Sequence, residues 1–278
     1  ENSEYKQTDN YVFWTASDRK AKEAKEKDLA EQKEIHKNKG RGKGKRPKNQ
    51  DKEVEWWGVL IGISKKLKDT KNYVIQHSSN LIEIEFKMEG PPLVILGAYA
   101  PHEGRIIEEK DDFYKKLQER CWKIPKIKEV LIIGDFNVRW HAAREHEQEI
   151  LGPYTVGRGK EFVEKAETKT SQAINRELCM DWCEECNLVH LNSWFEKDIE
   201  KKITYRDIGT NITNNDINWE SYAEIDHAFT RKKWRNTVTN IESKKELHTE
   251  SNHYPLIITY RRKLSKPEER EDKQSWKG

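Results

Sequence analysis

The segment Leu131-Ile-Ile-Gly-Asp135-Phe-Asn137 joins an apolar run to two polar side chains. Residues 130–133 are apolar and largely β-branched, which predicts a buried strand that stops at Gly134. Because residues two apart on a strand point to the same face, Asp135 and Asn137 would present a carboxylate and an amide side by side. A carboxylate can take a proton from water or hold a hard cation, and an amide can orient that water. The alternative is a strand-end turn in which both side chains bond the backbone.

Three further sites place polar side chains where apolar runs begin or end. They are Gly97-Ala-Tyr99-Ala-Pro101, Glu224-Ile-Asp226-His227 and Ser251-Asn252-His253-Tyr254-Pro255. A lone histidine beside a strand is more often a structural group than a catalytic one. Four polar strand ends in one chain favour a shared functional site.

The other apolar runs predict strands that alternate with helices. Helical spacing of apolar residues indicates helices over residues 111–122 and 175–186. Strands are predicted over residues 11–14, 57–64, 81–86, 93–99, 188–191, 203–205, 224–230 and 256–261. This order of elements predicts an α/β (α+β) fold.

The positive charge of the chain is concentrated in one segment. The net charge of the 278 residues is only +3, yet residues 36–48 contain Lys and Arg and no acid. We predict one domain over residues 1–264, with a charged, basic and disordered insertion at 18–55, and a charged tail at 265–278. The basic run is either a tethered arm for nucleic acid or a solvated surface loop.

The composition argues against a membrane protein and against a disulfide scaffold. No run approaches the roughly 18 apolar residues that span a bilayer, and residues 1–10 have no signal-peptide core. Four cysteines in a chain of this length indicate reduced thiols. We expect a soluble, intracellular protein, located in the nucleus if it acts on DNA, and we expect the natural chain to extend upstream.

The ordered motifs resemble those of the endonuclease/exonuclease/phosphatase (DNase I-like) superfamily. The resemblance spans residues 11 to 261 and rests on Gly-Asp-Phe-Asn, Tyr-Ala-Pro, Ile-Asp and Ser-Asn-His at the four sites above. Endonucleases of non-LTR retrotransposons are similar in finer detail, through Gly58-Val-Leu-Ile-Gly-Ile-Ser, Gly152-Pro-Tyr-Thr-Val-Gly, Asn175-Arg-Glu-Leu and Ile203-Thr-Tyr-Arg. The implied fold is a four-layer αββα sandwich of two mixed β-sheets flanked by helices.

The resemblance implies catalytic roles for five residues. Asp135 would activate or position the attacking water, and Asn137 would assist it. Asp226 would lie at the metal-phosphate site, and His253 would contact the scissile phosphate. Tyr99 would line the same pocket.

The resemblance also implies substrate and metal contacts. Thr204 and Ser251 would contact substrate together with Asn137. The family uses Mg²⁺ or Mn²⁺, for which Asp226 and Asn252 are the ligands that the pattern offers. Trp140, just after the catalytic loop, either stacks on a nucleic-acid base or packs beneath the loop.

Two departures from the family pattern predict a weakened site. The family's first strand carries a catalytic Asn, and the next motif carries the main metal-binding Glu; Glu1 and Glu4, both in loop-like sequence, give no clear counterpart. We therefore expect a central N-terminal strand to be missing. Asn252 stands where the family pattern has an Asp bonded to the catalytic histidine. In a Ser-His-Asp triad the equivalent change costs about 10⁴ in rate.

Two other patterns have a structural and a metal-binding interpretation. Cys179, Cys183 and Cys186 have the spacing of an iron-sulfur motif, but helical spacing favours small buried apolar groups. His102, His141 and His146 lie near acids, but their spacing fits no zinc pattern, and we interpret them as surface histidines.

The sequence thus predicts a Mg²⁺-dependent phosphodiester hydrolase, a DNA endonuclease of retrotransposon type with nucleic acid as its partner. A reverse transcriptase could follow it in the full-length protein. The alternative is a degenerate member that binds nucleic acid or a protein without cleaving. Loss of the N-terminal motifs favours the alternative, whereas retention of Asp135, Asn137, Asp226 and His253 favours the enzyme.

Overall fold

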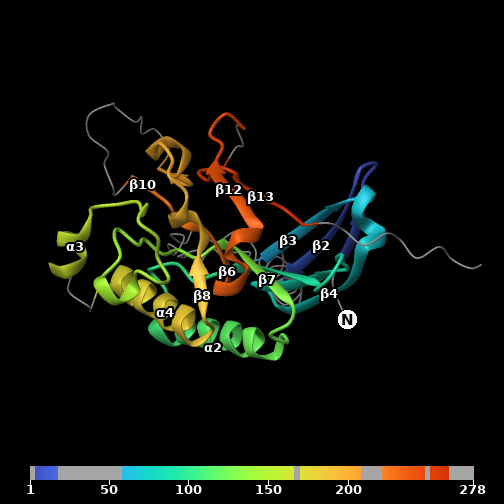
Figure 1. Cartoon of the computed structure of the whole chain (residues 1–278), viewed down its shortest axis with the longest axis horizontal. Coiled ribbons are helices and arrows are strands. Elements are labelled where there is room, and N and C mark those ends of the chain that lie inside the picture. Colours follow the sequence, from blue (N-terminus) through green and yellow to red (C-terminus); the bar gives the residue numbers. More distant parts are fainter. Residues whose placement is uncertain (1–3, 18–57, 166–169, 208–220, 248–250, 263–278) are drawn as a thin grey trace, which may run out of the picture.

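The computed structural model describes residues 4–17, 58–165, 170–207, 221–247 and 251–262. Figure 1 shows helices on one side of a central sheet and further strands on its other side. The predicted insertion at 18–55 and the predicted tail at 265–278 lie outside the described residues. None of the helices in the described residues combines the length and apolar character of a membrane span.

A six-stranded sheet forms the centre of the molecule. Its strands lie in the order β4 (Lys71–Ser78), β5 (Leu81–Phe86), β6 (Leu93–Tyr99), β7 (Glu129–Asp135), β11 (Asp226–Arg231) and β8 (Leu188–His190). The sheet is mixed, because β6 and β7 are parallel and the other neighbours are antiparallel. A helix crossover, α2 (Ile107–Lys123), connects the parallel pair.

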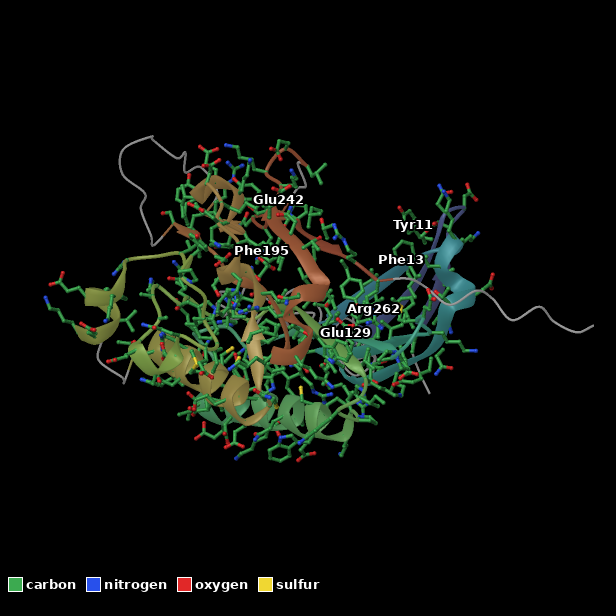
Figure 2. The ribbon with its side chains drawn as sticks, in the orientation of Figure 1. Tyr11, Phe13, Glu129, Phe195, Glu242 and Arg262 are labelled. Atoms are coloured by element: carbon green, nitrogen blue, oxygen red, sulfur yellow. The ribbon has the colours of Figure 1, made fainter. Side chains whose placement is uncertain are left out.

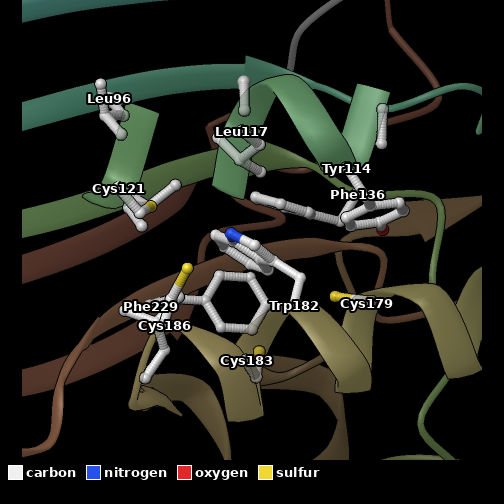
Figure 3. Packing of buried hydrophobic residues seen from close by; sticks show 14 of the residues in the cluster. Leu96, Tyr114, Leu117, Cys121, Phe136, Cys179, Trp182, Cys183, Cys186 and Phe229 are labelled. Carbon is white, nitrogen blue, oxygen red and sulfur yellow. The ribbon is translucent and has the colours of Figure 1, made fainter. Parts of the chain in front are cut away.

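Two helices, α2 and α4 (Ser171–Glu185), cover one face of this sheet. Leu117 and Cys121 lie one helical turn apart on α2 and are both buried. Trp182 of α4 lies among them in Figure 3, its ring 5.6 Å from that of Phe136 and 5.1 Å from that of Phe229. All four cysteines are free and buried in this core, which confirms their interpretation as small apolar groups.

Two separate antiparallel pieces cover the other face. One is a three-stranded sheet in the order β1 (Glu4–Gln7), β2 (Tyr11–Ser17) and β3 (Gly58–Ser64), and the other pairs β12 (Val238–Ser243) with β13 (Leu256–Tyr260). In Figure 2, Tyr11 and Phe13 lie on the side of the β1–β2–β3 sheet, and Phe195 and Glu242 lie on the side of the β12–β13 pair. Arg262 lies between these two sides.

The apolar layer under these two pieces is less complete than the layer under the helices. Ile95 and Ile133, on the two central strands, remain only partly buried although they pack against this core. Val59, Ile61 and Ile258 of the covering strands are also only partly buried.

The predicted fold class is confirmed, since a mixed sheet and flanking helices form an α/β molecule. In the described residues, both strand pieces that cover the central sheet are antiparallel. The described residues do not include the helices that would cover these strand pieces in a four-layer sandwich. The sequence does not predict β1, β4 or β12, whose polar residues interrupt the apolar pattern. Glu4 begins β1 and is not a loop residue.

Short elements complete the described chain. They are α3 (Lys160–Lys165), β9 (Tyr205–Arg206), β10 (Tyr222–Ala223) and the 3-10 helices η1 (Lys65–Thr70), η2 (Glu145–Glu147), η3 (Leu191–Trp194), η4 (Ile199–Lys201) and η5 (Lys232–Thr237).

Candidate active site

Three of the predicted site residues lie at one level of the central sheet. Tyr99 at the end of β6 pairs in register with Asp135 at the end of β7, and Asp135 pairs with Asp226 at the start of β11. Because β11 runs antiparallel to β7, its start meets the two strand ends at the same edge. All three residues are half-buried.

The turn from Asp135 to Asn137 has a fixed shape. At Gly134, φ is 152° and a Cβ would lie 1.8 Å from a backbone oxygen of β6, so a larger residue does not fit. The backbone N–H of Asn137 donates to Oδ1 of Asp135 at 2.9 Å, and Nδ2 of Asn137 donates to the oxygen of Ala100 at 2.9 Å. Phe136, fully buried between them, anchors the turn in the helix-side core.

His253 joins this edge through a hydrogen bond to Asp226. Nδ1 of His253 lies 2.9 Å from Oδ2 of Asp226, and Nε2 lies 3.9 Å from Oδ2 of Asp135. A carboxylate accepts, so Nδ1–H is the donor and Nε2 is turned toward Asp135. The imidazole also packs edge-on against the ring of Tyr205, with 5.2 Å between centroids.

The charges at this edge shift the pKa of both Asp135 and His253. Burial, followed by the negative charge of Asp226, raises the pKa of Asp135 to about 7, against the opposing effects of His253 and the Asn137 N–H. Burial lowers the pKa of His253, but the hydrogen bond to Asp226 and the charges of Asp226 and Asp135 outweigh burial and raise it. The hydrogen bond from His253 to Asp226 therefore favours the protonated imidazole, beside an Asp135 carboxyl group whose pKa is about 7.

The start of β11 is positioned by two buried side chains. The hydroxyl of Thr204 accepts from the backbone N–H groups of Ile225 and Asp226, each at 3.0 Å. Nδ2 of Asn192 donates to the backbone oxygen of Asp226 at 3.1 Å. The prediction that Thr204 contacts substrate is wrong, because this residue is 0% exposed and its hydroxyl binds the backbone that carries Asp226.

The Asn175-Arg-Glu motif of α4 holds the loop that follows β7. Nδ2 of Asn175 donates to the backbone oxygen of Asn137 at 3.1 Å. Arg176 donates to two loop carbonyls at 3.3 and 2.9 Å and to both carboxylate oxygens of Glu147 at 2.8 and 2.6 Å. In the sequence, this motif supports only the resemblance, and its role in holding the loop was not predicted. The signal was a charged pair within an otherwise amphipathic helix.

Trp140 and His141, in this loop, are both buried. Trp140 is 1% exposed and its ring lies 5.5 Å from that of His190 and 5.9 Å from that of His227, so a substrate contact by stacking is wrong. His141 is 9% exposed, and its Nδ1 accepts the N–H of Arg158 at 3.3 Å. The interpretation of His141 as a surface histidine is therefore also wrong.

The predicted orientation of His253 by residue 252 is wrong. Asp226 accepts the hydrogen bond of the His253 ring, whereas the Asn252 side chain shares a hydrogen bond with Tyr205. The weakening expected from Asn252 is therefore not supported by the geometry, because the carboxylate that stabilises the imidazolium is present. Ser251 accepts the backbone N–H of His253 at 3.1 Å, and its predicted contact with substrate remains a prediction.

Oxygen donors at this edge fit a divalent cation. Burial and, after it, the negative charge of Asp226 raise the pKa of Asp135, and a bound cation would relieve the repulsion between the two carboxylates. Such a site suits Mg²⁺ or Mn²⁺, because Mg²⁺ is typically held by one or two carboxylates and keeps several waters. The ligand roles of Asp226 and Asn252 remain predictions.

A second group of ligand-type side chains lies deeper in the fold. His190, Glu224 and His227 are buried, with ligand atoms within 4.8 Å of one another. Nε2 of His227 donates to the carbonyl of Val138 at 2.9 Å, so its Nδ1 must accept from Nε2 of His190, also at 2.9 Å. Nζ of Lys202 lies 3.9 Å from the Glu224 carboxylate. We assign these groups a structural role, since hydrogen bonds and an ion pair already use them.

Comparisons with known proteins give distant relatives. No family model matches the chain. Craniofacial development protein 2 of Bos taurus is 24% identical over 211 residues, which cover 74% of this chain and 31% of that protein. The same protein of Tragulus javanicus is 24% identical, with coverage of 74% and 32%. The chain thus spans less than two thirds of these relatives.

Solved structures similar to this chain include nucleases and a phosphatase. The 3′ phosphatase NExo from Neisseria, bound to a product DNA hairpin, has a TM-score of 0.49 at 12% identity and covers 74% of this chain and 76% of that chain. The endonuclease domain of TRAS1, a telomere-specific non-LTR retrotransposon, has a TM-score of 0.46 at 14% identity, with 74% of each chain covered. An endonuclease/exonuclease/phosphatase family protein from Leptotrichia buccalis has a TM-score of 0.41 at 15% identity, with coverage of 65% and 53%.

The described residues form the mixed sheet with flanking helices that the sequence predicts. Four of the predicted site residues lie together, because Tyr99, Asp135 and Asp226 align across three strands and His253 is bonded to Asp226.

Proposed function

We propose that this chain is a metal-dependent phosphodiester hydrolase that cuts DNA, of the retrotransposon endonuclease type. The observation that carries the proposal is the Asp226–His253 pair facing Asp135 at one sheet edge. An acid with a pKa of about 7 beside an imidazole whose pKa is raised combines a proton acceptor with a phosphate-binding donor. A nuclear location and a downstream reverse transcriptase remain predictions.

The residues of the group have distinct tasks in the proposed reaction. The hydrogen bond to Asp226 favours the protonated form of His253, and the Nε2–H of His253 donates to an oxygen of the scissile phosphate. Asp135, held by the Asn137 N–H, takes the proton of the attacking water. Asp226 would hold a divalent cation at this edge, and the cation would neutralise charge on the phosphoryl oxygens.

Nicking of supercoiled plasmid with Mg²⁺ or Mn²⁺ tests the proposal. We expect Asp135→Ala and His253→Gln each to lower the nicking rate by about 10²-fold or more. Asn252→Asp should change the rate by less than about threefold, because Asp226 already serves His253. Asp112→Asn, on the exposed face of α2, is the control and should leave the rate unchanged.

Failure of the folded wild-type chain to nick DNA with either metal would refute the proposed activity. DNA binding without cleavage would then favour the alternative of a non-cleaving member. A large gain of rate in Asn252→Asp would contradict the assignment of Asp226 as the partner of His253.

A further inference from the structure

The loop after β7 alternates in burial beyond the two polar residues of the motif. The half-buried positions are Asp135, Asn137 and Arg139, and the fully buried positions between and after them are Phe136, Val138 and Trp140. Arg139 therefore continues the series of side chains on the open side of the loop. It is not part of the motif that predicts the site, and none of the roles above uses it.

Arg139 lies on the His253 flank of the site. Its charge interacts with Tyr205, whose ring packs against the imidazole of His253 at 5.2 Å. On the protein side, Nη1 of Arg139 donates to the backbone oxygen of Tyr222 at 3.4 Å, a long hydrogen bond at the beginning of β10. β10 pairs with β9, in which Tyr205 forms a bridge to His253, so Arg139 is bonded to the strand pair that also contacts the proposed phosphate-binding histidine.

The surroundings of Arg139 contain charge of both signs. Burial lowers the pKa of Arg139, the nearby Arg158 acts in the same direction, and Glu103, Tyr205 and Asp207 act against them. The guanidinium stays charged in every case, because arginine is not deprotonated in proteins. Burial and Arg158 disfavour the charged guanidinium, and an anion bound at Arg139 would oppose these two effects as Glu103 and Asp207 do.

We propose that Arg139 binds a backbone phosphate of the DNA strand next to the scissile phosphate, and so sets the register of the strand in the site. This assignment rests on the proposed function. The planar guanidinium suits the task, because its parallel N–H groups match the oxygens of a phosphate. Such a contact carries no base preference, so Arg139 contributes to affinity and positioning and leaves sequence choice to other residues.

The competing role for Arg139 is structural, through its hydrogen bond to Tyr222. The two roles respond differently to substitution. Arg139→Lys keeps the positive charge but loses the fork of donors, whereas Arg139→Gln keeps a side-chain amide donor and loses the charge. A phosphate contact depends on charge, and the bond to a neutral carbonyl depends on a donor.

Binding of a short DNA duplex, measured by fluorescence anisotropy in EDTA between 50 and 200 mM NaCl, tests the assignment. The slope of log Kd against log salt should become shallower by about 0.9 in Arg139→Gln, since one ion contact to the duplex is lost. The Kd at low salt should rise about tenfold. Arg139→Lys should keep the wild-type slope. Arg235→Gln, whose guanidinium lies over Trp194 at 4.2 Å beyond the far end of β11, is the matched control.

A wild-type slope in a folded Arg139→Gln variant overturns the assignment, and so does an equal loss of slope in Arg139→Lys. If Arg139→Gln does not fold by circular dichroism, Arg139→Met, which also removes the charge, takes its place in the same measurement. Plasmid nicking in parallel reports the proposed function separately. A chain that nicks DNA with an unchanged slope in Arg139→Gln would refute the role of Arg139 alone, whereas a changed slope without nicking would refute only the activity.

Discussion

The ionised form of Asp135 destabilises the folded state. Its pKa is raised from 3.8 to about 7 by burial and by the charge of Asp226, so the folded state binds this proton more tightly than the unfolded state. The contribution of this group to stability is therefore present below about pH 4 and is lost as the pH rises to about 7. Asp135→Asn, which keeps an acceptor for the Asn137 N–H, should match the wild type at pH 4 and exceed its unfolding free energy by about 1 to 2 kcal/mol at pH 8.

Urea unfolding at the two pH values, without added metal, checks this residue-scale prediction. Asp112→Asn on α2 is the matched control, since Asp112 is an exposed acid paired with Lys116 at 2.5 Å. A gain of the same size at both pH values would show that repulsion between Asp135 and Asp226 is not its source. Activity should fall in the same variant, as expected where a site residue costs stability.

At the scale of elements, α4 serves both the core and the site. Trp182 fills the core under the sheet, and one to two turns earlier Arg176 clamps the loop that carries the site. Glu147, 0% exposed, takes two of the hydrogen bonds of Arg176. Arg176→Met should lower the unfolding free energy by about 3 kcal/mol, because it removes the main partner of a buried carboxylate. The double variant Arg176→Met with Glu147→Gln should recover at least about 1 kcal/mol.

Urea unfolding of the two single variants and the double variant gives the coupling energy of this pair. Lys165→Met, which breaks the exposed pair with Glu161 on α3, should change stability by less than about 0.5 kcal/mol. Strict additivity of Arg176→Met and Glu147→Gln would mean that the loop is held by its other contacts.

Elements with long apolar runs were predictable from sequence, and polar elements were not. β5, β6, β7, α2 and α4 have clear periodicity, whereas β4 and β12 interleave polar residues with few apolar ones. In the site, Asp135 and Asn137 follow from one strand end. The hydrogen bond between His253 and Asp226 could not be predicted from the sequence. Residues 226 and 253 meet only through the register of β11 and the return of the chain after β12. Burial of Thr204 depends on the same long-range contacts.

Over the whole molecule, the central sheet separates a complete core from an incomplete one. Leu117, on the helix side, is 0% exposed, whereas Ile133, on the other face, is only partly buried between the two separate strand pieces. Leu117→Ala should therefore cost about 2 to 5 kcal/mol of unfolding free energy, and Ile133→Ala less than about 2 kcal/mol. The same asymmetry predicts that amides of β12 and β13 exchange hydrogen faster than those of β5, β6 and β7, since sheet pieces with few buried contacts open locally. Urea unfolding and native-state hydrogen exchange measure the two effects independently. The contrary result is an equal loss of unfolding free energy for the two substitutions, with uniform protection of the amides from exchange. That result would show that the second layer is as tightly packed as the first, and that its half-buried side chains are shielded from water in solution.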